Sequence, residues 1–217
     1  ADVEALKPGN DIFGIAWGCL QTYVATNALL MVQKPKEWSF EQMAAWSVTF
    51  ATTEEAFQEL APVVAGERVL IHAATGGVGL VAVQFAQRVG ATIFATCSAA
   101  KVEHLRGLGV KYITTTRDGA QFEEDMKRFL KEDGAEGIDC VMNSLSHDDY
   151  IGRSLRLLNQ GGRFMEIGKR GIWTHDQMAA ARPDVVYEKI AMDWVMEFQP
   201  ERYNMLMRRL VSQMEQG

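Results

Sequence analysis

The sequence predicts an α/β fold built on a doubly wound parallel sheet, preceded by a small β-rich segment. From about residue 68, short apolar runs alternate with helical stretches, as strands and helices alternate in a parallel sheet. Four of these runs, "RVLIHA", "TIFAT", "IDCVMN" and "GRFMEI", are rich in β-branched or large apolar residues. Such runs are typical of strands that helices cover on both faces.

The β-rich segment, residues 1–37, is expected to be the tail of a domain whose beginning is missing. There "KPGN" predicts a turn, "DIFGIA" and "TYVATN" predict strands, and no helix is expected. The second domain, residues 38–217, is expected to begin on a helix. Ser39 is a good N-cap, and Gln42 completes a capping box three residues later.

The second domain then alternates between the two kinds of element. The expected strands are 68–73, 92–96, 111–115, 138–143 and 162–167; the expected helices are 78–88, 99–107, 120–132, 148–158 and one around 200–214.

Composition limits the classes of function. The 217 residues include 28 acidic and 22 basic side chains, for a formal net charge of -6. This charge gives no basic footprint for nucleic acid, so a few local groups must meet any anionic ligand. No apolar run reaches the roughly 20 residues that cross a bilayer, and the N-terminus does not resemble a signal peptide. Three dispersed cysteines argue against disulfides and a Cys-x-x-Cys metal site, and favour a reducing, cytoplasmic setting.

The stretch "LIHAATGGVGLVAVQFAQ", residues 70–87, predicts a strand, a glycine turn and a helix. In a parallel sheet this turn lies at the carboxyl edge, where free N–H groups and the helix dipole attract a phosphate. Gly76 and Gly77 let a pyrophosphate approach, and Gly79 lets the helix pack closely on the strand. The turn indicates a dinucleotide site, with a tight connection without ligand as the alternative. It is not a P-loop, because no Gly-Lys-Ser/Thr follows.

The residues after the second expected strand favour NADPH over NADH. NAD sites usually carry Asp or Glu there, but "TCSAAK" contains no acid, and the first one is Glu103. Ser98 and Lys101 suit a 2′-phosphate. Arg117 can reach the same phosphate, because loops after the second and third strands are neighbours in this fold. The alternative for Lys101 and Arg117 is an ordinary solvated surface position.

Three stretches, "GERVLIHAATGGVGLVAVQFAQRVGATIFAT", "DCVMNSLS" and "LLNQGGRFMEIGKRGIW", closely resemble the enoyl reductase domains of modular polyketide synthases and animal-type fatty acid synthases. These belong to the medium-chain dehydrogenase/reductase superfamily, and the resemblance covers nearly the whole chain. It implies a Rossmann-type domain, part of a small GroES-like substrate-side domain at residues 1–37, NADPH and no metal. NADPH would deliver hydride to the β-carbon of a trans-2-enoyl thioester, and an acid would protonate the α-carbon. An acyl carrier protein would present the chain, beside other domains of a multienzyme synthase.

The resemblance also assigns roles to residues. Lys169 matches the lysine proposed in the family as proton donor, and Asp193 matches an aspartate that follows in many relatives. The implied cofactor-binding residues are Thr52, Gly76, Gly77, Val78, Gly79, Ser98, Lys101, Arg117, Asn143, Ser144 and Gly168.

Two local departures from the family are visible. In "YEKIAMDW", two extra residues separate Tyr187 from Asp193, so an ordinary strand-end acid is the alternative for Asp193. In "TTEEAF", Glu54 and Glu55 replace the paired tyrosines of relatives. We expect both glutamates to be solvated or capping acids, with an altered acyl pocket as the alternative.

Other functions stay open at this point. They are a stand-alone quinone or enone reductase, a cyclopropane-forming variant acting on a halogenated chain, and a cofactor-binding module without turnover. A zinc alcohol dehydrogenase is disfavoured, because the histidines are scattered; they are His72, His104, His147 and His175.

Overall fold

The structure, a computed structural model, describes residues 6–216. It divides into two compact units. The larger unit is the continuous segment Glu55–Ile190, and the smaller unit combines the segment up to Glu54 with the segment from Ala191 onward. The sequence predicted a single boundary after residue 37. The division differs because helix α1 (Phe40–Glu54) shares a hydrophobic core with the N-terminal hairpin and with the helices after residue 190.

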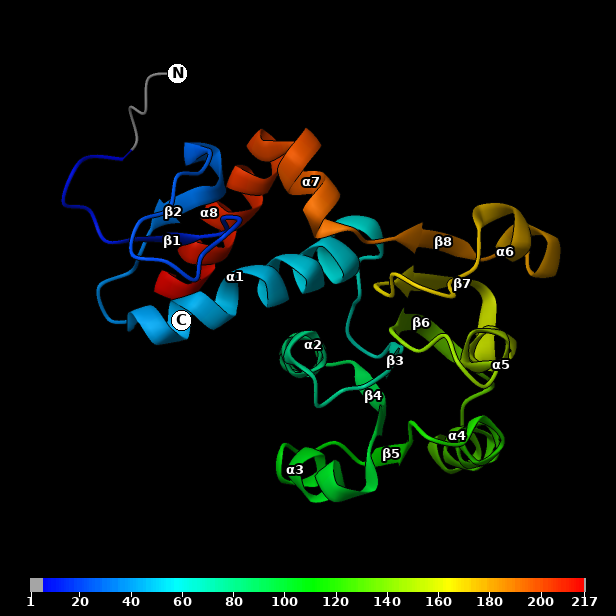
Figure 1. The fold of residues 1–217 in the computed structure, drawn as a ribbon. Helices are drawn as coiled ribbons and strands as arrows, with labels where there is room; N and C mark the ends of the chain where they lie inside the picture. The colour runs from blue at the N-terminus through cyan, green and yellow to red at the C-terminus, as the bar shows by residue number, and fades with distance from the viewer. Residues whose placement is uncertain (1–5, 217) are drawn as a thin grey trace. The chain divides into compact units, whose positions relative to one another are not determined.

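The larger unit contains one six-stranded sheet in the order β5-β4-β3-β6-β7-β8 (Figure 1). Every neighbouring pair is parallel, which confirms the predicted doubly wound α/β fold. The strand predicted at 162–167 is longer in the structure, because β7 begins four residues earlier. Strand β8 was not predicted. The strands are β3 Arg68–Ile71, β4 Thr92–Cys97, β5 Tyr112–Thr115, β6 Ile138–Asn143, β7 Leu158–Glu166 and β8 Val186–Lys189.

Helices cover both faces of this sheet because the strand side chains alternate. Val69 and Ile71 of β3 join one core with α2 and α3, whereas Leu70 joins another core with α4 and α5. Figure 1 shows these two pairs of helices on opposite sides of the strands. The helices are the π-helical segment Glu55–Leu60, α2 Gly77–Val89, α3 Val102–Gly107 after a 3-10 turn at Ala99–Lys101, α4 Gly119–Asp133, α5 Tyr150–Leu157 and α6 His175–Ala181.

The smaller unit combines a short hairpin with three helices, α1, α7 (Met192–Phe198) and α8 (Pro200–Gln216). The predicted capping box is present at the start of α1: the backbone N–H of Ser39 donates to Gln42 Oε1 at 2.8 Å, and that of Gln42 donates to Ser39 Oγ at 3.2 Å. No helix among the described residues is long and apolar enough to cross a bilayer.

The predicted strand at 22–27 is wrong. Strand β1 (Ile12–Gly14) pairs antiparallel with β2 (Met31–Gln33), which follows a 3-10 turn at Ala28–Leu30. Val32 is buried in the same core as Phe13, whereas Tyr23 is 88% exposed. The alternation in "TYVATN" therefore has no core to face, and the later segment takes the partner strand.

Candidate functional site

The glycine turn lies at the point where the strand order reverses. After β3 the chain continues to β4 and β5 on one side, and β6 to β8 lie on the other side. Ligands of open parallel sheets bind outside the carboxyl ends of the strands at this position. Gly76 is the N-cap of α2 and supplies no side-chain cap, so the first N–H groups of the helix lack a side-chain acceptor. Gly76 and Gly77 are exposed, Val78 is half-buried, and the helix dipole favours an anion here.

Gly79 brings α2 against its own turn. A Cβ at this position would lie 2.6 Å from the carbonyl oxygen of Ala73 and 2.6 Å from the Cα of Ala74. Both are backbone atoms, so the turn would have to move. At Gly76 the same oxygen would be 3.3 Å away, which is a much milder contact. Gly79 therefore has a packing role, and Gly76 mainly keeps the helix end open.

Gly79→Ala is expected to destabilise the protein by about 1–3 kcal/mol, the usual cost of overpacking, and to weaken dinucleotide binding. Urea unfolding and a fluorescence titration measure the two effects. Gly107→Ala in α3 is the control, because a Cβ there meets nothing within 4 Å. Equal stability of the two variants would contradict the packing role of Gly79.

A buried polar network lies beneath the turn. The ring nitrogens of His72 hydrogen-bond Thr96 Oγ1 (Nδ1, 3.2 Å) and Ser154 Oγ (Nε2, 2.7 Å). Thr96 Oγ1 also accepts the backbone N–H of Ala73 at 3.0 Å. Ala73 has φ of 49°, a left-handed conformation that costs energy for a non-glycine residue. The network thus ties β3, β4 and α5 to the strained start of the turn.

The role of His72 was not predicted from the sequence, in which it is one of four scattered histidines. Burial, and to a smaller extent the charge of His147, lowers the pKa of His72 to about 3. The ring is therefore neutral at pH 7, with one donor and one acceptor nitrogen for the two hydroxyls. A polar residue directly after the apolar run "VLI" is the signal that could have indicated this position.

The carboxyl ends of β4 and β5 bring the expected 2′-phosphate residues to one place. Cys97 and Thr115 are paired in register, and the backbone N–H of Thr116 donates to the Cys97 carbonyl at 3.2 Å. Ser98 comes directly after Cys97, and Arg117 comes directly after Thr116. The hydroxyl of Ser98 does not cap the 3-10 turn that ends at Lys101. Lys101 and Arg117 are both exposed, and neither forms an ion pair within residues 6–216.

A second group of predicted residues lies at the end of β6 and in the loops that follow β6 and β7. Asn143 is fully buried, and its Nδ2 donates to Glu166 Oε2 at 2.6 Å. Ser144 Oγ donates to the carbonyl of His72 at 3.4 Å, which links this group to the glycine turn. The loop with Gly168 and Lys169 comes directly after β7, and Lys169 is exposed. Glu166 also belongs to this group, although it was not among the residues predicted from the sequence.

Two predicted residues lie in the smaller unit. Thr52 is buried near the end of α1, and its hydroxyl donates to the Val48 carbonyl at 2.7 Å. Asp193 is in the first turn of α7. The larger unit therefore holds all the other predicted site residues on one edge of its sheet, and these two belong to a separate compact unit.

The expectation that Glu54 and Glu55 are solvated is wrong. Glu54 is 2% exposed and Glu55 is 4% exposed. Glu54 Oε1 lies 3.0 Å from Arg209 Nη2 of α8, an ion pair without hydrogen-bond geometry. The carboxylate is buried because α1 packs on α8 at this point, and burial of a carboxylate requires a charged or polar partner.

The described residues do not fit a metal. No three His, Cys, Asp or Glu side chains in residues 6–216 come together as a metal site. His72 is engaged by two hydroxyls, and His147 Nε2 lies 3.1 Å from the carbonyl of Thr116.

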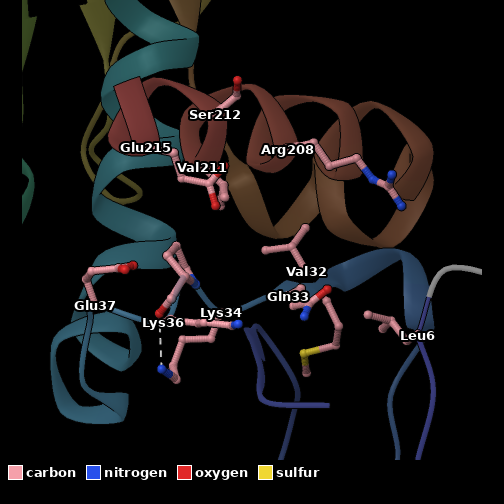
Figure 2. Close-up of a pocket in the computed structure, with 12 residues that line it drawn as sticks. Leu6, Val32, Gln33, Lys34, Lys36, Glu37, Arg208, Val211, Ser212 and Glu215 are labelled. Carbon is pink, nitrogen blue, oxygen red and sulfur yellow. Dashed lines mark hydrogen bonds between the residues drawn. The ribbon is translucent and has the colours of Figure 1, made fainter. Parts of the chain in front are cut away.

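A groove of about 470 Å³ lies in the smaller unit, between the segment 31–37 and α8 (Figure 2). The Lys34 ammonium donates to the backbone carbonyls of Pro35 (3.1 Å) and Trp38 (2.6 Å). Two of the three N–H groups of this ammonium are therefore already used. None of the predicted site residues lines this groove. The candidate site is therefore the carboxyl edge of the large sheet.

Comparison with known proteins identifies the family. The family described as zinc-binding dehydrogenase matches residues 77–212. The spectinabilin polyketide synthase system protein NorB of Streptomyces orinoci is 41% identical over 218 residues, which cover 100% of this chain and 10% of NorB. The crystal structure of CurK enoyl reductase is 43% identical with a TM-score of 0.80, and the match covers 88% of this chain and 56% of that chain. The chain belongs to the family of polyketide synthase enoyl reductase domains.

These enoyl reductase domains belong to the medium-chain dehydrogenase/reductase superfamily. This domain is also similar to a solved structure whose name describes a cyclopropanase. The CurF ER cyclopropanase from the curacin A biosynthetic pathway is 35% identical with a TM-score of 0.81, covering 87% of this chain and 55% of that chain. The enoyl reductase domain thus spans a tenth of NorB and just over half of each of the two solved chains.

Proposed function

We propose that this domain is an NADPH-dependent enoyl-thioester reductase of a polyketide or fatty acid synthase. In the proposed reaction, NADPH supplies a hydride to the β-carbon of a trans-2-enoyl chain, and the α-carbon receives a proton. The observation that carries the proposal is the open glycine turn at the switch point, with Lys101 and Arg117 on the neighbouring loops after β4 and β5 and no acid between β4 and α3. An acyl carrier protein and adjacent synthase domains are the proposed partners.

The chain's own residues provide the binding functions. The N–H groups at Gly77, Val78 and Gly79 suit the pyrophosphate, because the helix N-terminus is open there. Ser98 offers a hydroxyl, and Lys101 and Arg117 offer charge-assisted hydrogen bonds to a 2′-phosphate. The group formed by Asn143, Ser144 and Gly168 is proposed to line the nicotinamide side. Thr52 is a further proposed cofactor contact, on the basis of the family resemblance.

Lys169 is the proposed catalytic acid. It follows β7 at the carboxyl edge and is exposed to an incoming substrate. A protonated ammonium near the thioester can stabilise the negative charge that develops on its carbonyl oxygen, or deliver the proton to the α-carbon. Asp193 is proposed as a second catalytic residue, again on the resemblance.

Lys169→Ala is expected to lower kcat by about 100-fold, because a positioned acid contributes about that factor or more. NADPH affinity is expected to change by less than about threefold, since the phosphate contacts stay in place. Arg170→Ala, an exposed cation one residue further along the same loop, is the control. Unchanged turnover of the Lys169 variant would remove Lys169 from the mechanism.

The substrate class is tested by comparing acceptors in one assay. A carrier-bound trans-2-enoyl thioester and a small quinone are each offered with NADPH, and NADPH oxidation is followed by absorbance. Reduction of the thioester alone supports the proposal. Reduction of the quinone alone would favour a stand-alone quinone or enone reductase.

The similarity to the CurF cyclopropanase supports a second candidate function. A halogenated enoyl thioester distinguishes the two outcomes by mass spectrometry. A product that has kept its halogen and gained two hydrogens indicates reduction. A product that has lost the halide and closed a ring indicates cyclopropane formation.

A further inference from the structure

Glu166 is a buried carboxylate at the end of β7 with two neutral donors. It is 1% exposed, and it is paired in register with Asn143 at the end of β6. Its Oε2 accepts Asn143 Nδ2 at 2.6 Å, and its Oε1 accepts the backbone N–H of Gly168 at 2.6 Å. Burial raises the pKa of Glu166, and the two hydrogen bonds oppose this effect. A buried carboxylate is costly unless its oxygens are satisfied, and here each oxygen accepts one hydrogen bond.

The two hydrogen bonds connect two loops that the proposed function uses. Asn143 Oδ1 accepts the N–H of Leu145 at 3.3 Å, and the carbonyl of Asn143 accepts the N–H of Ile167 at 2.9 Å. The amide of Asn143 is therefore oriented, with its nitrogen toward Glu166 and its oxygen toward the 143–145 loop. Glu166 determines this orientation, because a carboxylate can only accept.

The loop after β7 closes directly over the carboxylate. A Cβ at Gly168 would lie 2.7 Å from Glu166 Oε1 and 3.1 Å from Ile172 Cγ2. The position thus excludes a side chain where the loop turns toward Lys169. The carbonyl of Glu166 also accepts the N–H of Ile190 at 2.8 Å, which holds the end of β7 from its other side.

We propose that Glu166 is a positioning residue that orients the Asn143 amide and the Gly168–Lys169 loop at the carboxyl edge of the sheet. It touches neither substrate nor cofactor in this proposal. It acts through Asn143 and Gly168, and the catalytic part of the proposal rests on the function proposed above.

The test compares Glu166→Ala and Glu166→Gln with the unmodified chain. Glu166→Ala removes both acceptors, so we expect kcat to fall by about tenfold or more while the KM for NADPH changes by less than about threefold. Amide hydrogen exchange at Gly168 and Leu145, followed by NMR, is expected to accelerate. Glu166→Gln keeps an acceptor for Gly168 but presents an amide to Asn143, so we expect an intermediate kcat and slow exchange at Gly168.

Asp139 provides a matched control on β6. Its carboxylate also accepts one backbone N–H (Arg68, 2.8 Å) and one side-chain amide (Asn159, 2.7 Å), but it lies near the start of its strand. Asp139→Ala is expected to lower stability and leave kcat unchanged. An equal fall of kcat in the Asp139 and Glu166 variants would reduce Glu166 to a structural residue and overturn the proposal.

Two outcomes separate this proposal from the proposed function. If the unmodified chain reduces no enoyl thioester, the proposed function fails, and exchange at Gly168 and Leu145 still decides whether Glu166 positions the loops. Unchanged exchange in Glu166→Ala overturns the positioning role whatever the activity. If Glu166→Ala does not fold, Gly168→Ala displaces the same carboxylate and is expected to accelerate exchange at Leu145, which Glu166 reaches through Asn143; wild-type exchange at Leu145 in that variant overturns the proposal.

Discussion

Replacing Lys101 and Arg117 together by alanine is expected to weaken NADPH binding by about 100-fold, with NADH binding changed by less than about threefold. Each hydrogen bond from a charged group to a phosphate contributes about 1.5–3 kcal/mol, or roughly tenfold or more in affinity. The 2′-phosphate is absent from NADH, so only NADPH loses these contacts. A fluorescence titration of the two cofactors with both proteins measures the difference.

The control for this prediction removes the same net charge from the opposite edge of the sheet. Arg88 and Lys131 are exposed and lie in the last turns of α2 and α4. Arg88→Ala with Lys131→Ala is expected to leave the NADPH preference unchanged. Equal weakening of NADPH and NADH by the Lys101 and Arg117 substitutions would remove both residues from a 2′-phosphate site.

Stability between pH 6.5 and pH 4 is expected to depend on His72. Its pKa is about 3 in the folded chain and near 6.5 when unfolded, so the unfolded state binds the proton first as the pH falls. This contribution to stability is complete above pH 6.5 and decreases by about 1.4 kcal/mol for each pH unit below it. His72→Gln removes the titrating group. Below pH 6.5, the slope of the free energy of unfolding against pH should therefore be smaller in the variant by about 1.4 kcal/mol per pH unit.

Urea unfolding at several pH values tests this expectation. The His72 variant is also expected to be less stable by about 1–3 kcal/mol at pH 7, because the hydroxyls of Thr96 and Ser154 lose a well-placed partner. His104→Gln is the matched control, since His104 is exposed on α3. A His72 variant with the wild-type pH slope would show that the ring is not held neutral by the fold.

Local sequence patterns predicted the order of the elements well. The turn after β3 depends on an apolar strand with glycines at its end. Helix α2 ends at Gly90 in a left-handed C-cap. Helix α4 begins after the N-cap Asp118 and ends at Gly134, again in a left-handed C-cap. The strand at 22–27 failed because alternation alone does not say which segment has a core to face. β8, α6 and α7 are short and depend on packing more than on propensity.

The sequence by itself determined the doubly wound class, the glycine turn and the absence of an acid after β4, because each depends on residues close together in the chain. Only the tertiary structure decided that α1 shares a core with α7 and α8, that Glu54 is buried against Arg209, and that His72 and Glu166 are anchored by partners on other elements. Those partners are 23 to 155 residues away, as with Asn143 and Glu166 or Glu54 and Arg209. Burial and hydrogen bonding across such distances follow from how helices pack on the sheet, which no local pattern specifies.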